Sequence, residues 1–137
     1  MSKPKNRNGI SEEIIACERA ALDRWGRGDP GGFTEISADE VTYFDPGTEK
    51  RVDGIGSLRQ LYAPIEGKIK IDRYEMLNPK VQVHGDTAVL TFNLIDYTGR
   101  PEGSRAEGHW NATEVYCRIN GQWKIIHTHW SYTKKSS

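Results

Sequence analysis

Apolar and polar positions follow the period of a helix near the start of the chain. Apolar residues recur there every three or four positions, at Ile14, Cys17, Ala21, Leu22 and Trp25. Ser11 is a suitable N-cap before them, and the glycine-rich run 26–28 ends the pattern. The pattern therefore predicts an amphipathic helix that begins at Ser11.

Two shorter helices are expected downstream. Asp29 followed by proline repeats a helix-start signal, which predicts a short helix over 31–36. Residues 41–44 read as a strand that a turn at 45–47 closes. We expect Asp53 to cap a third helix, because apolar residues follow it at helical spacing. Those residues are Ile55, Leu58, Leu61 and Tyr62.

From residue 69 onward the period changes to two, as in β-strands. The predicted strands are 69–77, 81–83, 88–97, 110–119 and 123–132. Three of the four links between them suit antiparallel hairpins or a bent strand. Helices followed by long strands predict an α+β fold, in which about three N-terminal helices pack on a strongly curved antiparallel sheet.

The last predicted strand carries apolar residues on both of its faces. Strict alternation places His127 and His129 with Trp123 and Ile125 on one face, and Ile126, Thr128 and Trp130 on the other. A sheet that is apolar on both sides needs two covers. Helices would supply one, and a second copy of the chain the other.

Length and composition fit one globular domain. The 137 residues are 36% hydrophobic and 28% charged, and we expect a single domain over 11–133 between polar tails at 1–10 and 134–137. Nineteen basic residues balance nineteen acidic ones, so neither nucleic acid nor a membrane surface is an expected partner. Cys17 and Cys117 lack metal-ligand spacing, which favours free thiols. Because the first residues lack a signal-peptide pattern, we expect a cytoplasmic protein.

Four motifs together resemble the NTF2-like superfamily. They lie at 41–46, 52–54, 77–86 and 121–131, and are most similar to the association, or hub, domain of calcium/calmodulin-dependent protein kinase type II. The resemblance spans about residues 10–131 and implies an α+β cone with a pocket between helices and sheet. It also implies self-association through the outer sheet face, as a homodimer or a larger ring. The sequence contains no glycine-rich ATP loop or HRD-type motif, so we expect a stand-alone hub-like domain without kinase activity.

The resemblance also identifies candidate ligand-binding positions. Hub pockets hold a small carboxylate with basic residues, and the matching positions here are Leu58, Asn93, Glu114 and Trp130, none of which is basic. Trp110 shares its strand face with Glu114 and adds aromatic surface. Aromatic faces beside a carboxylate suit cations, so we expect an unidentified neutral or cationic small molecule and no cofactor.

An enzymatic alternative comes from the same superfamily, which includes isomerases, cyclases and dehydratases. Such chemistry needs an acid or base in a dry pocket. Asp45 or Glu114 are candidate bases, and Tyr43 is a candidate hydrogen-bond donor. Asp45 is equally well explained as a turn residue, so catalysis stays open. A scaffold with a vestigial cavity is the third alternative.

The two histidines of the last strand suggest a weaker alternative, a metal site. His127 and His129 share a face, and His109 on a neighbouring strand is the candidate third ligand. The resemblance turns the side of Trp130 toward the pocket, which leaves the histidines at the outer face. We therefore expect interface histidines and no metal, and protonation below a pKa near 6.5 would then loosen assembly.

Overall fold

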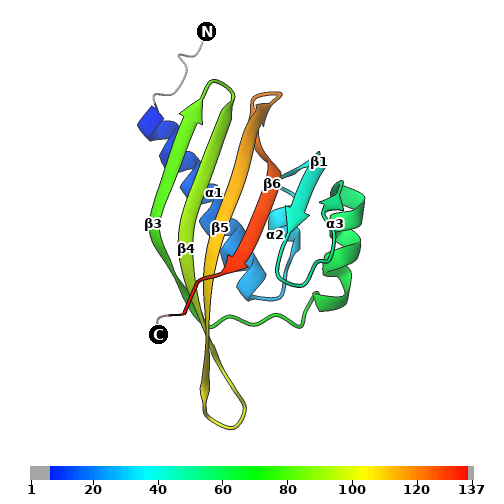
Figure 1. Cartoon of the computed structure of the whole chain (residues 1–137), viewed down its shortest axis with the longest axis vertical. Coiled ribbons are helices and arrows are strands. Elements are labelled where there is room, and N and C mark those ends of the chain that lie inside the picture. The colour runs from blue at the N-terminus through cyan, green and yellow to red at the C-terminus, as the bar shows by residue number, and fades with distance from the viewer. Residues whose placement is uncertain (1–6, 136–137) are drawn as a thin grey trace.

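Helices cover one face of a six-stranded sheet in the computed structural model, which describes residues 7–135 (Figure 1). The helices are α1 (Arg7–Gly26), α2 (Gly31–Thr34) and α3 (Ile55–Tyr62), the last followed by a 3-10 turn, η1 (Ala63–Ile65). The strands are β1 (Ser37–Phe44), β2 (Val52–Asp53), β3 (Arg73–His84), β4 (Thr87–Gly99), β5 (Arg105–Ile119) and β6 (Gln122–Tyr132). The predicted α+β cone is confirmed.

The sheet is mixed, with strand order β2-β1-β6-β5-β4-β3. Strands β3 to β6 form consecutive antiparallel pairs, as hairpin connections require. Strand β1 pairs with β6 in parallel, so the prediction of a wholly antiparallel sheet was wrong. The parallel pairing has a topological cause, because β1 lies beside β6, the last strand of the chain, and no hairpin links the two.

Helix α1 begins earlier than the sequence predicted. It starts at Arg7, and the hydroxyl of Ser11 donates a hydrogen bond of 2.9 Å to the Arg7 carbonyl inside the helix, so Ser11 is not the N-cap. Of the polar tail expected at 1–10, residues 1–6 lie outside the described residues and 7–10 belong to α1. At the other end, 133–135 follow β6 without regular structure, and 136–137 lie outside the described residues.

The two short helices follow their start signals only in part. An Asp29 carboxylate oxygen accepts a hydrogen bond from the Gly31 amide at 3.0 Å, so the signal is used although α2 ends at Thr34. Asp53 does not cap α3. It lies in β2 opposite Thr42, and Gly54 with φ of 88° makes the turn into α3.

Strand β3 is one bent strand where the sequence predicted two segments. Its pairing with β4 skips between Leu77 and Lys80, and Asn78 has a left-handed φ of 48°. This bulge lets the strand pass Pro79 without losing the sheet.

A second bulge changes the faces of β6. Val115 pairs with His127, whereas the next β5 residue, Tyr116, pairs with Ile125, so Ile126 is the extra residue. Ile125 is fully buried in the core, while His127 lies on the opposite face. The alternation that grouped Ile125 with the histidines was therefore wrong, because it assumed a strand without a bulge.

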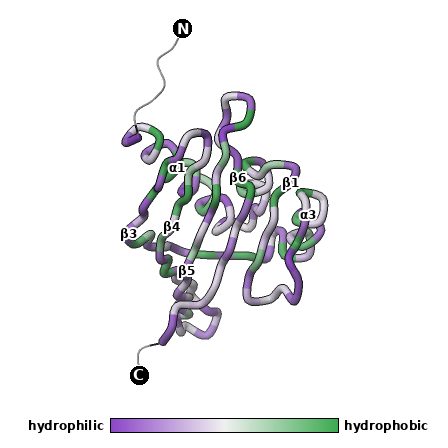
Figure 2. Tube along the Cα trace, turned by 45° about the horizontal axis from the view of Figure 1, so that its top comes forward, coloured by the Kyte–Doolittle hydropathy of each residue, from purple (hydrophilic) through white to green (hydrophobic). Residues whose placement is uncertain are grey.

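The core lies between the sheet and the helices. From β4 it takes Ala88, Leu90, Phe92 and Leu94, and from α1 it takes Ile10, Ile14, Ala21 and Leu22. Hydrophobic residues are interleaved with hydrophilic ones along the strands in Figure 2, as expected where alternate residues enter the core. Each fully buried side chain of this size contributes about 1.5–3 kcal/mol. Within residues 7–135, no helix has the length and hydropathy needed to cross a membrane.

Candidate functional site

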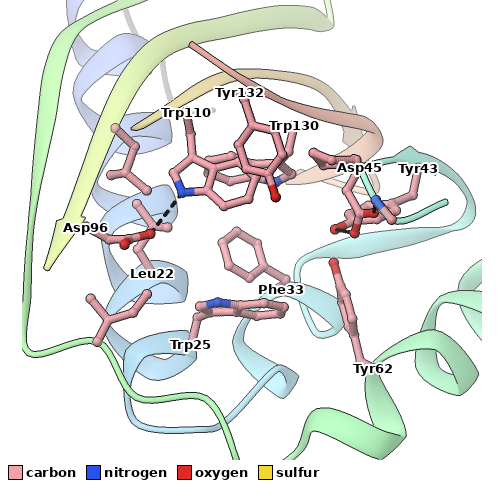
Figure 3. A pocket seen from close by; sticks show the side chains of 14 residues that line it. Leu22, Trp25, Phe33, Tyr43, Asp45, Tyr62, Asp96, Trp110, Trp130 and Tyr132 are labelled. Atoms are coloured by element: carbon pink, nitrogen blue, oxygen red, sulfur yellow. Dashed lines mark hydrogen bonds between the residues drawn. The ribbon is translucent and has the colours of Figure 1, made fainter. Parts of the chain in front are cut away.

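A pocket of about 320 Å³ opens between the sheet and the helices (Figure 3). Strands β4, β5 and β6 form one wall, and α1, α2 and α3 form the other. Seven aromatic side chains line it: Trp25, Phe33, Tyr43, Tyr62, Trp110, Trp130 and Tyr132. The volume is within the range of small-molecule sites.

The aromatic rings hold one another in fixed orientations. Trp25 on α1 packs edge-on against Tyr62, with ring centroids 5.1 Å apart. On the sheet wall, Trp110 packs edge-on against Trp130 at 6.0 Å and lies 4.7 Å from the ring of Tyr132. Tyr132 is 64% exposed, so it forms the rim of the pocket. These contacts leave the aromatic faces pre-formed around the cavity.

Asp45 is fixed by the turn that follows β1. One carboxylate oxygen accepts the hydroxyl of Tyr43 at 2.8 Å, and the other accepts the amide of Gly47 at 2.7 Å. The first contact joins the carboxylate to a phenol inside the pocket, and the second closes an Asx turn. Asp45 is therefore a turn residue, one of the two alternatives that the sequence left open, and it also lines the pocket.

A second pocket carboxylate, Asp96, projects from β4. Its oxygens accept the indole N–H of Trp110 at 2.9 Å and the amide of Gly108 at 3.1 Å. Asp96 thus orients Trp110 while it lines the cavity. Among the described lining residues, Asp45 and Asp96 are the charged side chains, and none is Lys, Arg or His.

The two tyrosines beside Asp45 stay neutral. Burial raises the pKa of Tyr43 far above its usual range, and Tyr62 and the Asp45 carboxylate add to this. Burial also raises the pKa of Tyr62, with further contributions from the negative charges of Glu114 and Asp45. Both phenols are therefore hydrogen-bond donors at every ordinary pH.

Glu114 lies in the core rather than in the pocket wall. Its carboxyl and that of Glu18 on α1 are neighbours, and both side chains have no exposed surface. The Tyr116 hydroxyl donates to one Glu18 oxygen at 2.8 Å, and the Glu18 and Glu114 carboxyls are close enough to hydrogen-bond to each other, as is the Thr128 side chain to Glu114. Burial raises the pKa of both carboxyls, and for Glu114 the charge of Glu18 adds to it.

The structure brings some of the expected site residues together and separates others. Trp110, Trp130, Tyr43 and Asp45 line the pocket. Glu114, Leu58 and Asn93 do not: Leu58 is 2% exposed in the core, and the side chain of Asn93 donates to Asn111 at 2.7 Å on an exposed part of the sheet. For Asn93 the reason is alternation along β4, because its neighbour Leu94 takes the inward position.

Sequence reasoning named four of the pocket residues and missed the others, among them Trp25, Tyr62 and Asp96. Trp25 and Tyr62 were placed on the apolar faces of α1 and α3, and Asp96 was not considered. Asp96 had a usable signal, because it continues the inward alternation that runs through Phe92 and Leu94.

The histidines lie on the outer face of the sheet. His127 shares a contact of 2.7 Å with the Thr42 hydroxyl, its ring lies 6.3 Å from that of His129, and Phe44 packs against both. Burial, followed by the neighbouring His129, lowers the pKa of His127. His109 contacts Glu107 instead, and the described residues hold no group of three or more His, Cys, Asp or Glu suited to a metal.

Comparisons with known proteins give the same family as the motifs. The model of the SnoaL-like domain matches residues 14–134. The chain belongs to the SnoaL-like domain family. As the sequence predicted, this SnoaL-like domain is similar to calcium/calmodulin-dependent protein kinase type II: it is 27% identical over 133 residues to the alpha chain of Drosophila melanogaster. That match covers 92% of the SnoaL-like domain but 24% of the kinase's length.

Solved structures agree. The SnoaL-like domain is 43% identical to a Parabacteroides distasonis protein named "putative ketosteroid isomerase", with a TM-score of 0.81 over 97% of this chain and 94% of that one. It also matches the association domain of the C. elegans kinase with a TM-score of 0.78 and 22% identity, over 92% and 97% of the two chains. The NTF2-like cone is therefore common to enzyme-like and association-type relatives.

Proposed function

We propose that this SnoaL-like domain binds a neutral or cationic small organic molecule in its aromatic pocket. The observation that carries the proposal is the lining: seven aromatic rings and two carboxylates, with no basic side chain among the described lining residues. Aromatic faces attract cations, by about 0.5–1 kcal/mol at exposed sites and about 2 kcal/mol or more where water is excluded. An anion would instead meet two like charges.

Three indoles that differ in charge test this proposal. Tryptamine, tryptophol and indole-3-propionate offer a cation, a neutral alcohol and an anion on one ring system. We expect tryptamine and tryptophol to bind in calorimetry, and indole-3-propionate to bind at least tenfold more weakly. Tighter binding of the propionate than of the amine would overturn the proposal.

A matched pair of tryptophan variants locates the binding. Trp25 lines the pocket, whereas Trp123 lies outside it, beside the guanidinium of Arg118. Trp25→Leu should weaken tryptamine binding, and Trp123→Leu should leave it unchanged. Equal effects of the two changes would mean that the pocket is not the binding site, as in a scaffold with a vestigial cavity.

Proton transfer in the pocket is the second candidate function. It is supported by the 2.8 Å bond between the Tyr43 phenol and the Asp45 carboxylate, and by the relative named for ketosteroid isomerase. Asp45 is then the base, since Glu114 has no exposed surface. If an isomerase or dehydratase activity is found, Asp45→Asn should reduce kcat by at least 100-fold, a typical contribution of a general base. An unchanged kcat would exclude this role.

Self-association through the outer sheet face is the assembly part of the proposal. Val89, Ile95 and Val115 are half-buried on that face, where Val115 pairs with Val89 on one side and with His127 on the other. A second copy would cover them. Sedimentation equilibrium should show a dimer or larger ring that Val115→Lys weakens, whereas Ser57→Lys on the exposed side of α3 should not. A wild-type protein that stays monomeric at high concentration would refute this part.

A further inference from the structure

The two pocket carboxylates lie at opposite ends of the cavity. Figure 3 shows Asp96 at one end, beside Leu22, and Asp45 at the other, beside Tyr43. Between them, aromatic rings form the middle of the cavity, with Trp25 facing the sheet wall across it. The pocket is thus polar at its two ends and apolar in its middle.

Both carboxylates are held in place before any ligand arrives. Asp45 accepts bonds from the Tyr43 hydroxyl and the Gly47 amide, and Asp96 accepts bonds from the Trp110 indole and the Gly108 amide. A carboxylate has about four lone-pair positions, so about two on each group can still accept a ligand. Groups that are already oriented lose little freedom when they bind.

The charge pattern determines what each end can bind. A carboxylate accepts hydrogen bonds and donates none, so each end selects a donor, most strongly a positively charged one. The middle selects an apolar body. A molecule with one polar end would leave the other carboxylate facing apolar ligand surface, which is unfavourable.

We propose that the pocket takes an elongated ligand with an apolar middle and a cationic or hydrogen-bond-donating group at each end, one for Asp45 and one for Asp96. This inference rests on the proposed function and names the ligand class of the same pocket. It assigns to Asp96 a role in specificity in addition to its contact with Trp110.

Matched amines test the two-ended requirement. Para-xylylenediamine and 4-methylbenzylamine share one ring and differ in the second amino group, and the corresponding two-ring pair, based on biphenyl, tests a longer span. We expect at least one diamine to bind about tenfold or more tightly than its monoamine in calorimetry, because it gains a second charge-assisted hydrogen bond. Equal affinities within both pairs would overturn the inference.

Amide variants then assign the two ends. Asp45→Asn and Asp96→Asn each remove the charge and keep a carbonyl acceptor for one of the two existing donors, while an amide NH2 replaces the other acceptor oxygen. Each should abolish most of the diamine's advantage, whereas Asp86→Asn, which removes a surface partner of Arg118, should preserve it. An advantage that survives both pocket changes would refute the assignment. Thermal unfolding of each ligand-free variant checks that the fold persists.

The outcomes separate this inference from the proposed function. If monoamines and diamines bind equally and Trp25→Leu weakens both, the pocket binds ligands but is not two-ended, so only the inference fails. If neither the amines nor tryptophol bind, the proposed function fails as well. A diamine advantage that depends on both Asp45 and Asp96 supports the two together.

Discussion

Replacing Glu114 with glutamine should make the stability of the fold less sensitive to rising pH. Glu18 and Glu114 share a site without solvent access, in which the hydroxyl of Tyr116 donates to Glu18. Two ionised carboxylates in that site would repel each other without solvation. The pair therefore keeps at least one proton, which one carboxyl donates to the other.

The magnitude follows from proton linkage. Burial raises the pKa of both carboxyls in the folded chain, whereas a glutamate in the unfolded chain titrates near 4.3. Above that pH the folded state binds more protons than the unfolded state, so the free energy of unfolding falls by about 1.4 kcal/mol per pH unit for each retained proton. This stabilisation is complete below a pH of about 4.3 and is lost as the pH rises toward the folded pKa.

In Glu114→Gln, the amide donates to Glu18 without needing a proton from solution. The variant should therefore lose at least one retained proton from its linkage. Over the pH range in which the wild-type pair keeps its extra proton, the free energy of unfolding of the variant should rise relative to that of the wild type by up to about 1.4 kcal/mol per pH unit. Because all other titrating groups are common to both proteins, the difference isolates the pair.

Urea unfolding at pH 5.5, 6.5 and 7.5 measures this difference. Glu49→Gln is the control, because Glu49 is exposed. Its curve should run parallel to that of the wild type. A constant difference between Glu114→Gln and the wild type across the three pH values would show that the folded pair binds no extra proton, which would refute the reasoning.

Three further predictions concern stability and are checked by urea or thermal unfolding. Tyr116→Phe removes the hydroxyl donor of the buried pair at nearly constant volume and should cost about 1–3 kcal/mol, and a neutral result would contradict that hydrogen bond. Gly54→Ala should cost about 1–2 kcal/mol because φ is 88°, whereas Gly56→Ala in the exposed first turn of α3 should be neutral or stabilising. Ile125→Ala should cost about 2–5 kcal/mol and Ile126→Ala clearly less, because Ile125 is fully buried whereas Ile126, the extra residue of the bulge, is only partly buried. Equal costs would place the bulge elsewhere.

Local patterns predicted the elements of this fold well. The apolar face of α1 depends on residues three or four positions apart, and Ile14 and Leu22 are buried as that spacing requires. Pairings between distant segments were not predictable in this way. The parallel contact of β1 with β6 and the bulge at Ile126 depend on which strand lies alongside, and a single strand's alternation carries no such information.

In the candidate site, too, the sequence predicted what depends on local pattern and missed what depends on distant segments. Trp110 and Trp130 point inward because each continues the alternation of its own strand locally, and the sequence placed both on the pocket side. Glu114 has the same inward direction, but its depth depends on α1. There Glu18 meets the β5 residue Tyr116, 98 positions away. A spacing of that size has no local signature.

Hydrogen-bond donors and exposure decide what a carboxyl group in this fold can do. This follows from comparing the two pocket carboxylates, Asp45 and Asp96, with the core pair, Glu18 and Glu114. Each pocket carboxylate accepts two bonds and lines a cavity, so it can meet a ligand. The core pair has fewer hydrogen-bond donors than carboxyl oxygens and no exposed surface, so it can exchange only a proton. Amide substitutions should therefore change different properties: in the pocket they change ligand affinity. In the core pair they change the pH dependence of stability and leave diamine affinity unaltered.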